Sequence, residues 1–151
     1  EHELGSNLVP YNNVETHGSL EQCIIDSNVS LVAETYISDS HIVFSEKIFR
    51  CLQLPRPWLL YSGAGSVNLL QTHGFDVMSD IVDISYDKIL DRDDRLMAMM
   101  DQLETFSNRQ YTQKEYQRFE VAMQHNQNLL QKLSCVWPEK LSSVLEQIKR
   151  T

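Results

Sequence analysis

The chain has 151 residues, of which 42% are hydrophobic and 23% are charged, and this length and composition favour one compact domain over two. Its formal net charge of -8 opposes binding to the phosphates of nucleic acids or to an anionic membrane surface. The three cysteines lie far apart, no apolar run reaches the roughly 18 residues of a membrane span, and no secretory leader is visible, so we expect a cytoplasmic protein without a disulfide framework.

The first part of the chain is expected to alternate strands and helices. Residues 1–28 lack a sustained hydrophobic period, which predicts an irregular lead-in, and a single domain is expected over residues 29–151. A β-branched run, Val29–Tyr36, predicts a buried strand. Ser45 begins a segment whose apolar residues recur at helical spacing until Pro55 stops the pattern, which predicts a helix.

A second strand and a second helix follow. The apolar run Trp58–Ser62 lies between a proline and a glycine, which is typical of a buried parallel strand. A short helix is expected from Ser66 until just before Gly74, because glycine commonly follows a helix end. A third strand is expected at Phe75–Met78 or at Ile81–Ile84.

Helices alone are expected in the remainder of the chain. One has Asp93 or Asp94 as its cap and carries an apolar stripe at steps of three and four: Leu96, Met99, Met100, Leu103 and Phe106. A longer helix is expected from Thr112 to Leu133, and Pro138 suits the first position of a last helix. This order predicts an α/β fold with a parallel sheet, on which the C-terminal helices pack as a brace.

The segment Ser45-Glu46-Lys47 has two interpretations, and both place a helix start at Ser45. In the first, the serine is an N-cap, Glu46 complements the helix dipole and Lys47 is solvated. In the second, the N–H groups of the helix start attract an anion, Lys47 reaches a phosphate and Glu46 accepts hydrogen bonds from ribose hydroxyls. The pattern by itself favours the cap.

Four segments carry a recognisable order of motifs: "LVAET" (31–35), "FSEKIFRCLQLPRPWLLYSGAGSVNLLQTHGFD" (44–76), "IVDISYD" (81–87) and "DRDDR" (91–95). Together they resemble the C-terminal part of a group of phage and bacterial glycosyltransferase-like proteins. The Ser-Glu-Lys portion is similar to the donor-binding motif of α-1,3-fucosyltransferases. The resemblance implies a Rossmann-like domain that forms the C-terminal half of a glycosyltransferase of the GT-B type.

The resemblance also assigns roles to the residues that match the motif. It implies that Glu46 binds the donor ribose and that Lys47 binds the diphosphate and assists its departure as the catalytic residue. Ser45 would cap the helix aimed at that diphosphate, and Glu34 would line the same pocket from the end of the preceding strand. Val43 replaces the aromatic residue that commonly helps to hold the base, so the nucleotide is not identified.

The small-residue loop after the second strand is a further candidate for the donor phosphates, with Gly63 and Gly65 as donor-binding residues. A dinucleotide fingerprint needs a third glycine at position 68, which is Asn68, and a tight strand-to-helix turn explains the same residues. The acidic residues between positions 83 and 94 lack the spacing of a calcium loop. The histidines show no metal spacing either, so neither a metal nor a cofactor is expected.

These inferences predict a nucleotide-sugar binding domain that takes part in metal-independent sugar transfer when joined to an acceptor-binding domain. The resemblance implies that the acceptor domain and the general base belong to a missing N-terminal half. Two alternatives stay open: a non-catalytic binding module with a Rossmann-like fold, and a helical interaction domain built on the helices of residues 96–148.

Overall fold

The computed structural model of the chain describes residues 22–38 and 41–149, with side chains described up to residue 134. The fold is mixed α/β, with two strands and several helices around them. Most of the predicted lead-in lies outside the described residues. Within it, residues 22–26 form a short helical segment where the sequence predicts irregular structure.

The sheet consists of β1 (Ser30–Ala33) and β2 (Trp58–Tyr61). The strands are parallel, with Ser30 opposite Trp58 and Ala33 opposite Tyr61, and α2 (Glu46–Cys51) connects them. The strand, helix, strand order predicted from the sequence is therefore confirmed, and so is the parallel pairing. β2 is the more deeply buried strand, because its apolar run packs against helices on both faces.

α2 begins at the predicted position. Ser45 has an extended backbone, and its Oγ accepts a hydrogen bond from the N–H of Lys47 at 3.4 Å, which is the geometry of an N-cap. Ile48 and Cys51 lie one turn apart and are buried, so α2 packs one apolar face on the sheet. Burial also raises the pKa of the Cys51 thiol to about 11, which keeps this cysteine unreactive.

The turn from β2 into α3 (Ser66–Thr72) also has the predicted place. Gly65 precedes the helix with φ 81°, and Gly74 follows it with φ 89°, both in the left-handed region that glycine adopts without a steric penalty. The predicted helix and its glycine end are confirmed.

The predicted third strand is wrong, since residues 75–84 contain no strand. Two aspartates in this segment bind nearby backbone N–H groups: Asp76 accepts from Met78 at 3.0 Å and Asp83 accepts from Ser85 at 2.9 Å. These local turns compete with an extended ladder. The short 3₁₀ helix η1 (Ser85–Lys88) follows, and its Tyr86 hydroxyl accepts from the N–H of Leu60 at 3.0 Å, which occupies the β2 edge that a third strand would need.

α4 (Arg92–Ser107) begins two or three residues earlier than its predicted cap, Asp93 or Asp94, implies. Asp91 is the cap, and its Oδ1 accepts from the N–H groups of Asp93 at 2.9 Å and Asp94 at 3.0 Å. Asp93 and Asp94 are therefore first-turn acids. The predicted stripe faces the core through Met99 and Phe106, which are buried.

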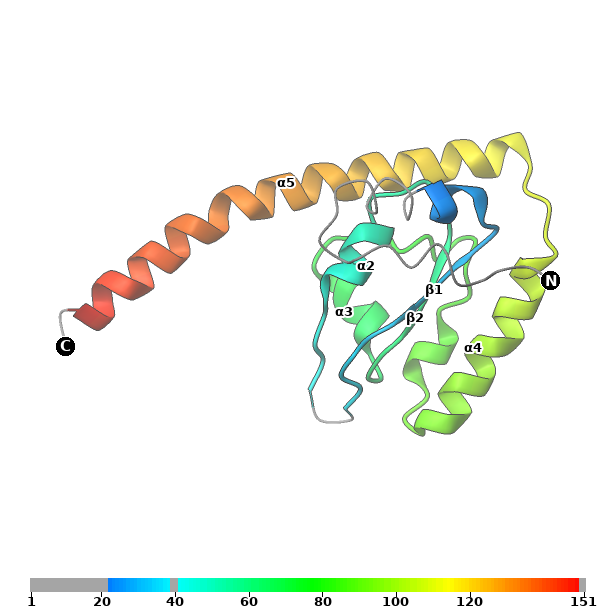
Figure 1. Cartoon of the computed structure of the whole chain (residues 1–151), viewed down its shortest axis with the longest axis horizontal. Helices are drawn as coiled ribbons and strands as arrows, with labels where there is room; N and C mark the ends of the chain where they lie inside the picture. The colour runs from blue at the N-terminus through cyan, green and yellow to red at the C-terminus, as the bar shows by residue number, and fades with distance from the viewer. Residues whose placement is uncertain (1–21, 39–40, 150–151) are drawn as a thin grey trace, which may run out of the picture.

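The last helix, α5, runs without interruption from Gln113 to Lys149, so the predicted break and new helix at Pro138 are wrong. A proline removes one N–H donor from a helix, and the bonds on either side of it are enough for the helix to continue. Figure 1 shows that the first half of α5 crosses the body of the protein, while its C-terminal half extends beyond the body.

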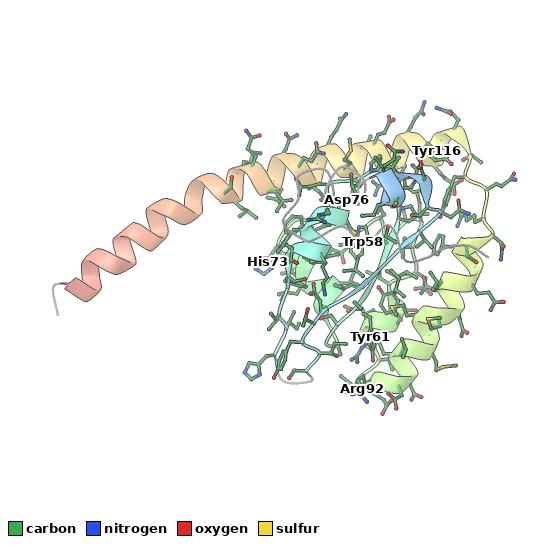
Figure 2. The ribbon with its side chains drawn as sticks, viewed as in Figure 1. Trp58, Tyr61, His73, Asp76, Arg92 and Tyr116 are labelled. Atoms are coloured by element: carbon green, nitrogen blue, oxygen red, sulfur yellow. The ribbon has the colours of Figure 1, made fainter. Side chains whose placement is uncertain are left out.

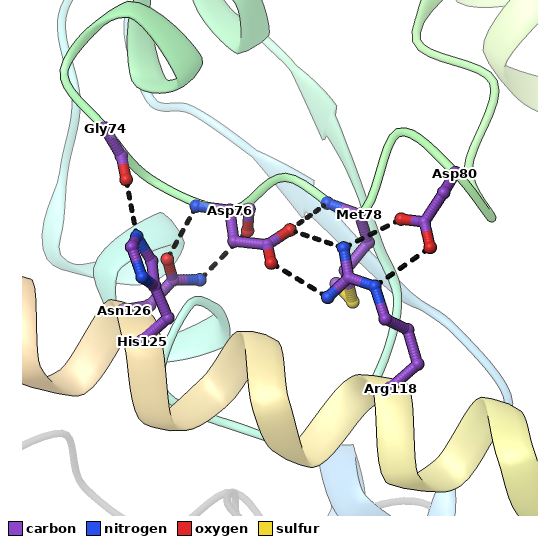
Figure 3. Close-up of polar contacts among 7 residues, drawn as sticks. All are labelled: Gly74, Asp76, Met78, Asp80, Arg118, His125 and Asn126. Carbon is purple, nitrogen blue, oxygen red and sulfur yellow. Dashed lines mark hydrogen bonds and ion pairs between the residues drawn. The ribbon is translucent and has the colours of Figure 1, made fainter.

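A cluster of polar contacts holds the first half of α5 against the loop that follows α3 (Figure 3). Arg118 forms ion pairs with Asp76 and Asp80, both at 2.8 Å. About two turns later, the buried side chain of Asn126 accepts from the N–H of Asp76 at 2.8 Å and donates to its carbonyl at 3.0 Å. The predicted brace therefore has specific polar anchors over the part of α5 whose side chains are described.

In Figure 1 the two strands lie in the middle, with α2 and α3 on one side, α4 on the other and α5 across one end. The carboxyl ends of both strands point away from α5. Among the described residues, none of the helices combines the length and the apolar character that a bilayer-spanning helix needs.

Candidate functional site

Three residues that the resemblance assigns to the donor pocket, Glu34, Ser45 and Lys47, meet at the carboxyl end of β1. Glu34 follows β1 directly, and its buried carboxylate accepts from the N–H of Ser45 at 3.1 Å. Lys47 reaches back from α2, and its Nζ donates to the carbonyl of Ala33 at 3.1 Å and to Oγ1 of Thr35 at 3.0 Å. The start of α2 is therefore tied to the end of β1 through both a carboxylate and an ammonium.

Glu46 and Lys47 lie on the solvent side of this cluster, and both side chains are exposed. An ammonium has three N–H donors. The two hydrogen bonds to Ala33 and Thr35 leave the third donor of Lys47 without a partner among the described residues. A cation held in this way at a strand end can donate to an oxyanion of a bound ligand.

The glycine loop between β2 and α3 is arranged differently. The buried carboxylate of Asp87 accepts from the N–H groups of Val67 at 3.0 Å and Asn68 at 2.9 Å, in the first turn of α3. This is the position in which a phosphate would bind at a helix start. The protein's own carboxylate fills it, and the donor-binding role of Gly63 and Gly65 stays a prediction.

A steric contact nevertheless explains why position 63 is a glycine. A Cβ atom added to it would lie 2.5 Å from the carbonyl oxygen of Ser38, so only glycine allows this approach of two backbone segments. The loop after β2 and the segment after β1 are therefore in direct contact at the carboxyl edge of the sheet.

An open hollow of about 710 Å³ lies at the same edge. One wall is the segment after β1 and the other is the beginning of α4, and the lining residues are Tyr36, Ile37, Ser38, Leu90, Asp91, Arg92 and Asp93. Figure 2 shows Tyr61, the last residue of β2, and Arg92 at the same end of the molecule, away from α5. Ligands of parallel α/β proteins bind outside the carboxyl ends of the strands, so the hollow lies where this architecture places a ligand.

No group of three or more His, Cys, Asp or Glu side chains among the described residues is arranged to hold a metal ion. The acids near the start of α4 instead cap the helix or pair locally: Asp91 binds two backbone N–H groups, and Asp93 lies 3.4 Å from Nε of Arg92.

The sequence pattern did not identify the hollow. Its two walls are separated by more than 50 positions, and "DRDDR" predicts helix caps and solvated turns when it is considered alone. The available signal was an aromatic residue, Tyr36, at the end of the predicted strand Val29–Tyr36, which also carries Glu34. That signal becomes specific only when the fold brings the start of α4 beside it.

Comparisons with known proteins found no match: no protein-family model, no curated protein and no solved structure is similar to the chain.

Proposed function

We propose that this chain is the donor-binding domain of a glycosyltransferase of the GT-B type, with a Rossmann-like fold, and that it binds the diphosphate of a nucleotide sugar beside Lys47. One observation carries the proposal: the Lys47 ammonium is held at the surface, at the carboxyl end of a parallel strand and beside a helix start. A fixed cation at this edge of a parallel sheet suits a phosphorylated ligand.

The other motif residues take complementary roles in this proposal. Glu46, which is exposed next to Lys47, accepts hydrogen bonds from the ribose hydroxyls. Glu34 is buried against the N–H of Ser45, so it positions the helix start while it lines the same pocket from the end of β1. Lys47 also stabilises the negative charge that develops on the leaving diphosphate, a role that needs no metal ion.

In this proposal the chain works together with a further domain that binds the acceptor and supplies the general base. The sugar nucleotide would lie at the carboxyl ends of the strands, and the acceptor would approach from the other domain.

A second candidate is a non-catalytic binding module. The observation that favours it is that Lys47 already donates hydrogen bonds to Ala33 and Thr35. These bonds give the lysine a structural role that needs no ligand. In that case the Ser-Glu-Lys segment only joins α2 to β1.

Calorimetric titration of UDP, GDP and ADP separates the two candidates. For a nucleotide that the wild type binds, Lys47→Ala should weaken binding about 10- to 100-fold, the worth of a lost charge-assisted hydrogen bond. Lys132→Ala is the matched control, because Lys132 is an exposed lysine on α5, far from this edge. Ser45→Ala should lower the melting temperature, since it removes the cap of α2.

Unchanged nucleotide affinity in Lys47→Ala would reject the diphosphate site. A wild type that binds none of the three nucleotides would leave the non-catalytic module as the better description.

A further inference from the structure

We propose that the hollow between Tyr36 and Leu90 is the subsite for the sugar of the donor, that is, for a neutral ring bearing several hydroxyl groups. The inference rests on the proposed nucleotide-sugar function, because it assigns the part of the ligand beyond the diphosphate. The volume of about 710 Å³ lies within the range of about 300 to 1,000 Å³ that small-molecule sites occupy.

Two large apolar side chains are exposed on the two walls of this hollow. Tyr36 is 57% exposed and Leu90 is 80% exposed. One exposed apolar side chain is ordinary on a protein surface, but two that line one concave site indicate a surface that a ligand covers. The C–H face of a sugar ring can pack on the aromatic ring of Tyr36, while the hydroxyl groups around its rim remain available for hydrogen bonds.

The polar groups of the hollow suit hydroxyl groups better than phosphate. Arg92 donates from Nε to Asp93 at 3.4 Å, and its two terminal NH₂ groups have no hydrogen-bond partner among the described residues. Asp91 uses Oδ1 for capping, which leaves Oδ2 as an acceptor. A hydroxyl group both donates and accepts, so this mixture of carboxylates and a guanidinium can satisfy it. The carboxylates of Asp91 and Asp93 and the guanidinium of Arg92 together give the hollow a net negative charge. This charge repels a phosphate inside the hollow.

Both walls of the hollow are anchored to the body of the protein. Arg95 is 1% exposed, and its Nη1 donates to the carbonyls of Ile89 at 2.7 Å and Leu90 at 3.1 Å, which holds the turn before α4. The other wall rests against Gly63 through the close approach of Ser38. A site that is shaped before the ligand arrives loses less conformational entropy on binding.

Along the chain, the lining of the hollow begins at the residue that follows the Lys47 contact. Nζ of Lys47 bonds Thr35, and Tyr36 is the next residue along the chain. In this proposal, a donor whose diphosphate contacts Lys47 extends along this segment and places its sugar over Tyr36.

The test compares each bare diphosphate with its sugar nucleotide by calorimetric titration: UDP with UDP-glucose, GDP with GDP-mannose and ADP with ADP-glucose. For the pair that the wild type binds, Tyr36→Ala should lower the affinity for the sugar nucleotide about 2- to 10-fold, which is the contribution of one aromatic contact. The affinity of the bare diphosphate should not change. Tyr36→Phe keeps the ring and should bind like the wild type.

Met97→Ala is the matched control, because Met97 is an apolar residue of α4 that is 64% exposed and does not line the hollow. Arg92→Ala should weaken the binding of the sugar nucleotide and leave the affinity for the bare diphosphate unchanged. Circular dichroism melts establish that each variant is folded before it is titrated.

Three results would overturn the subsite. Equal affinity of Tyr36→Ala and wild type for the sugar nucleotide would reject it and leave the Lys47 site standing. Weaker binding of the bare diphosphate by Arg92→Ala would show that the hollow holds phosphate. If the wild type binds none of the six nucleotides, the proposed function fails and the subsite fails with it.

Discussion

The contact between α5 and the loop after α3 allows a quantitative test of how the helix is held. The guanidinium of Arg118 donates two hydrogen bonds to Asp76, both at 2.8 Å, and two to Asp80, at 2.9 and 2.8 Å. Arg118 and Asp76 are 28% and 24% exposed, whereas Asp80 is 55% exposed. The partly buried Asp76 pair should therefore contribute more than the Asp80 pair.

Replacing Arg118 with methionine keeps the apolar stem and removes all four hydrogen bonds. Hydrogen bonds to charged groups contribute about 1.5 to 3 kcal/mol, and partial solvation reduces this, so we expect a loss of about 2 kcal/mol in the free energy of unfolding. For a chain of this length, that corresponds to a melting temperature lower by about 4 to 8 °C. Lys114→Met is the control, because it removes a positive charge from an exposed position of the same helix.

The effect should also depend on pH. Burial raises the pKa of Asp76, but the hydrogen bonds from Arg118 and from the N–H of Met78 outweigh it and hold this pKa below its usual value. Hydrogen bonds from Arg118 likewise lower the pKa of Asp80. A carboxyl whose pKa is lower in the folded state stabilises the fold above its unfolded pKa of about 4, and this stability is lost as the pH falls through the folded pKa.

Thermal melts followed by circular dichroism at pH 7 and near pH 3 measure both effects. The difference between wild type and Arg118→Met should be full at pH 7 and should shrink in acid. If Arg118→Met melts within 1 °C of Lys114→Met at pH 7, or if the difference is the same at both pH values, the reasoning about this cluster is refuted.

Three further substitutions test single contacts by urea unfolding. Asp87→Ala removes the internal cap of α3 and should cost about 2 kcal/mol, the upper range for a helix cap; a loss below about 0.5 kcal/mol would contradict the capping role. Gly63→Ala should cost about 1 to 3 kcal/mol, because its methyl group would lie 2.5 Å from the carbonyl of Ser38, and wild-type stability would contradict the close approach. Tyr86→Phe leaves the N–H of Leu60 without its acceptor and should cost about 1 to 3 kcal/mol, whereas a neutral result would show that this N–H finds another partner.

The elements that the sequence predicted correctly depend on interactions over a few residues. The cap at Ser45 acts on the N–H of Lys47, two positions away, and the glycines at the two ends of α3 adopt left-handed conformations that a residue without a Cβ atom reaches at no steric cost. The short apolar run of β2 also predicted a buried parallel strand, because only strands covered on both faces can be apolar throughout. The first strand was predicted to be buried as well, and this is wrong: β1 is buried only at Val32, and Leu31 is 45% exposed.

The predictions that failed depend on distant contacts or on competition between close alternatives. The third strand does not form, since Tyr86 occupies the edge of β2 at Leu60, 26 positions away in the sequence. Asp91 caps α4 in place of Asp93 or Asp94, and three neighbouring aspartates give the sequence no means of choosing. Pro138 predicted a helix boundary, but α5 passes through it.

By itself, the sequence determined the strand, helix, strand unit and the position of Lys47 at the start of α2, because both follow from local spacing and capping. Only the tertiary structure decided that Lys47 lies beside Glu34 and the end of β1, that Asp87 closes the start of α3, and that Tyr36 faces the beginning of α4. Such contacts join segments many positions apart, and which segments meet is settled by the packing of the helices on the sheet.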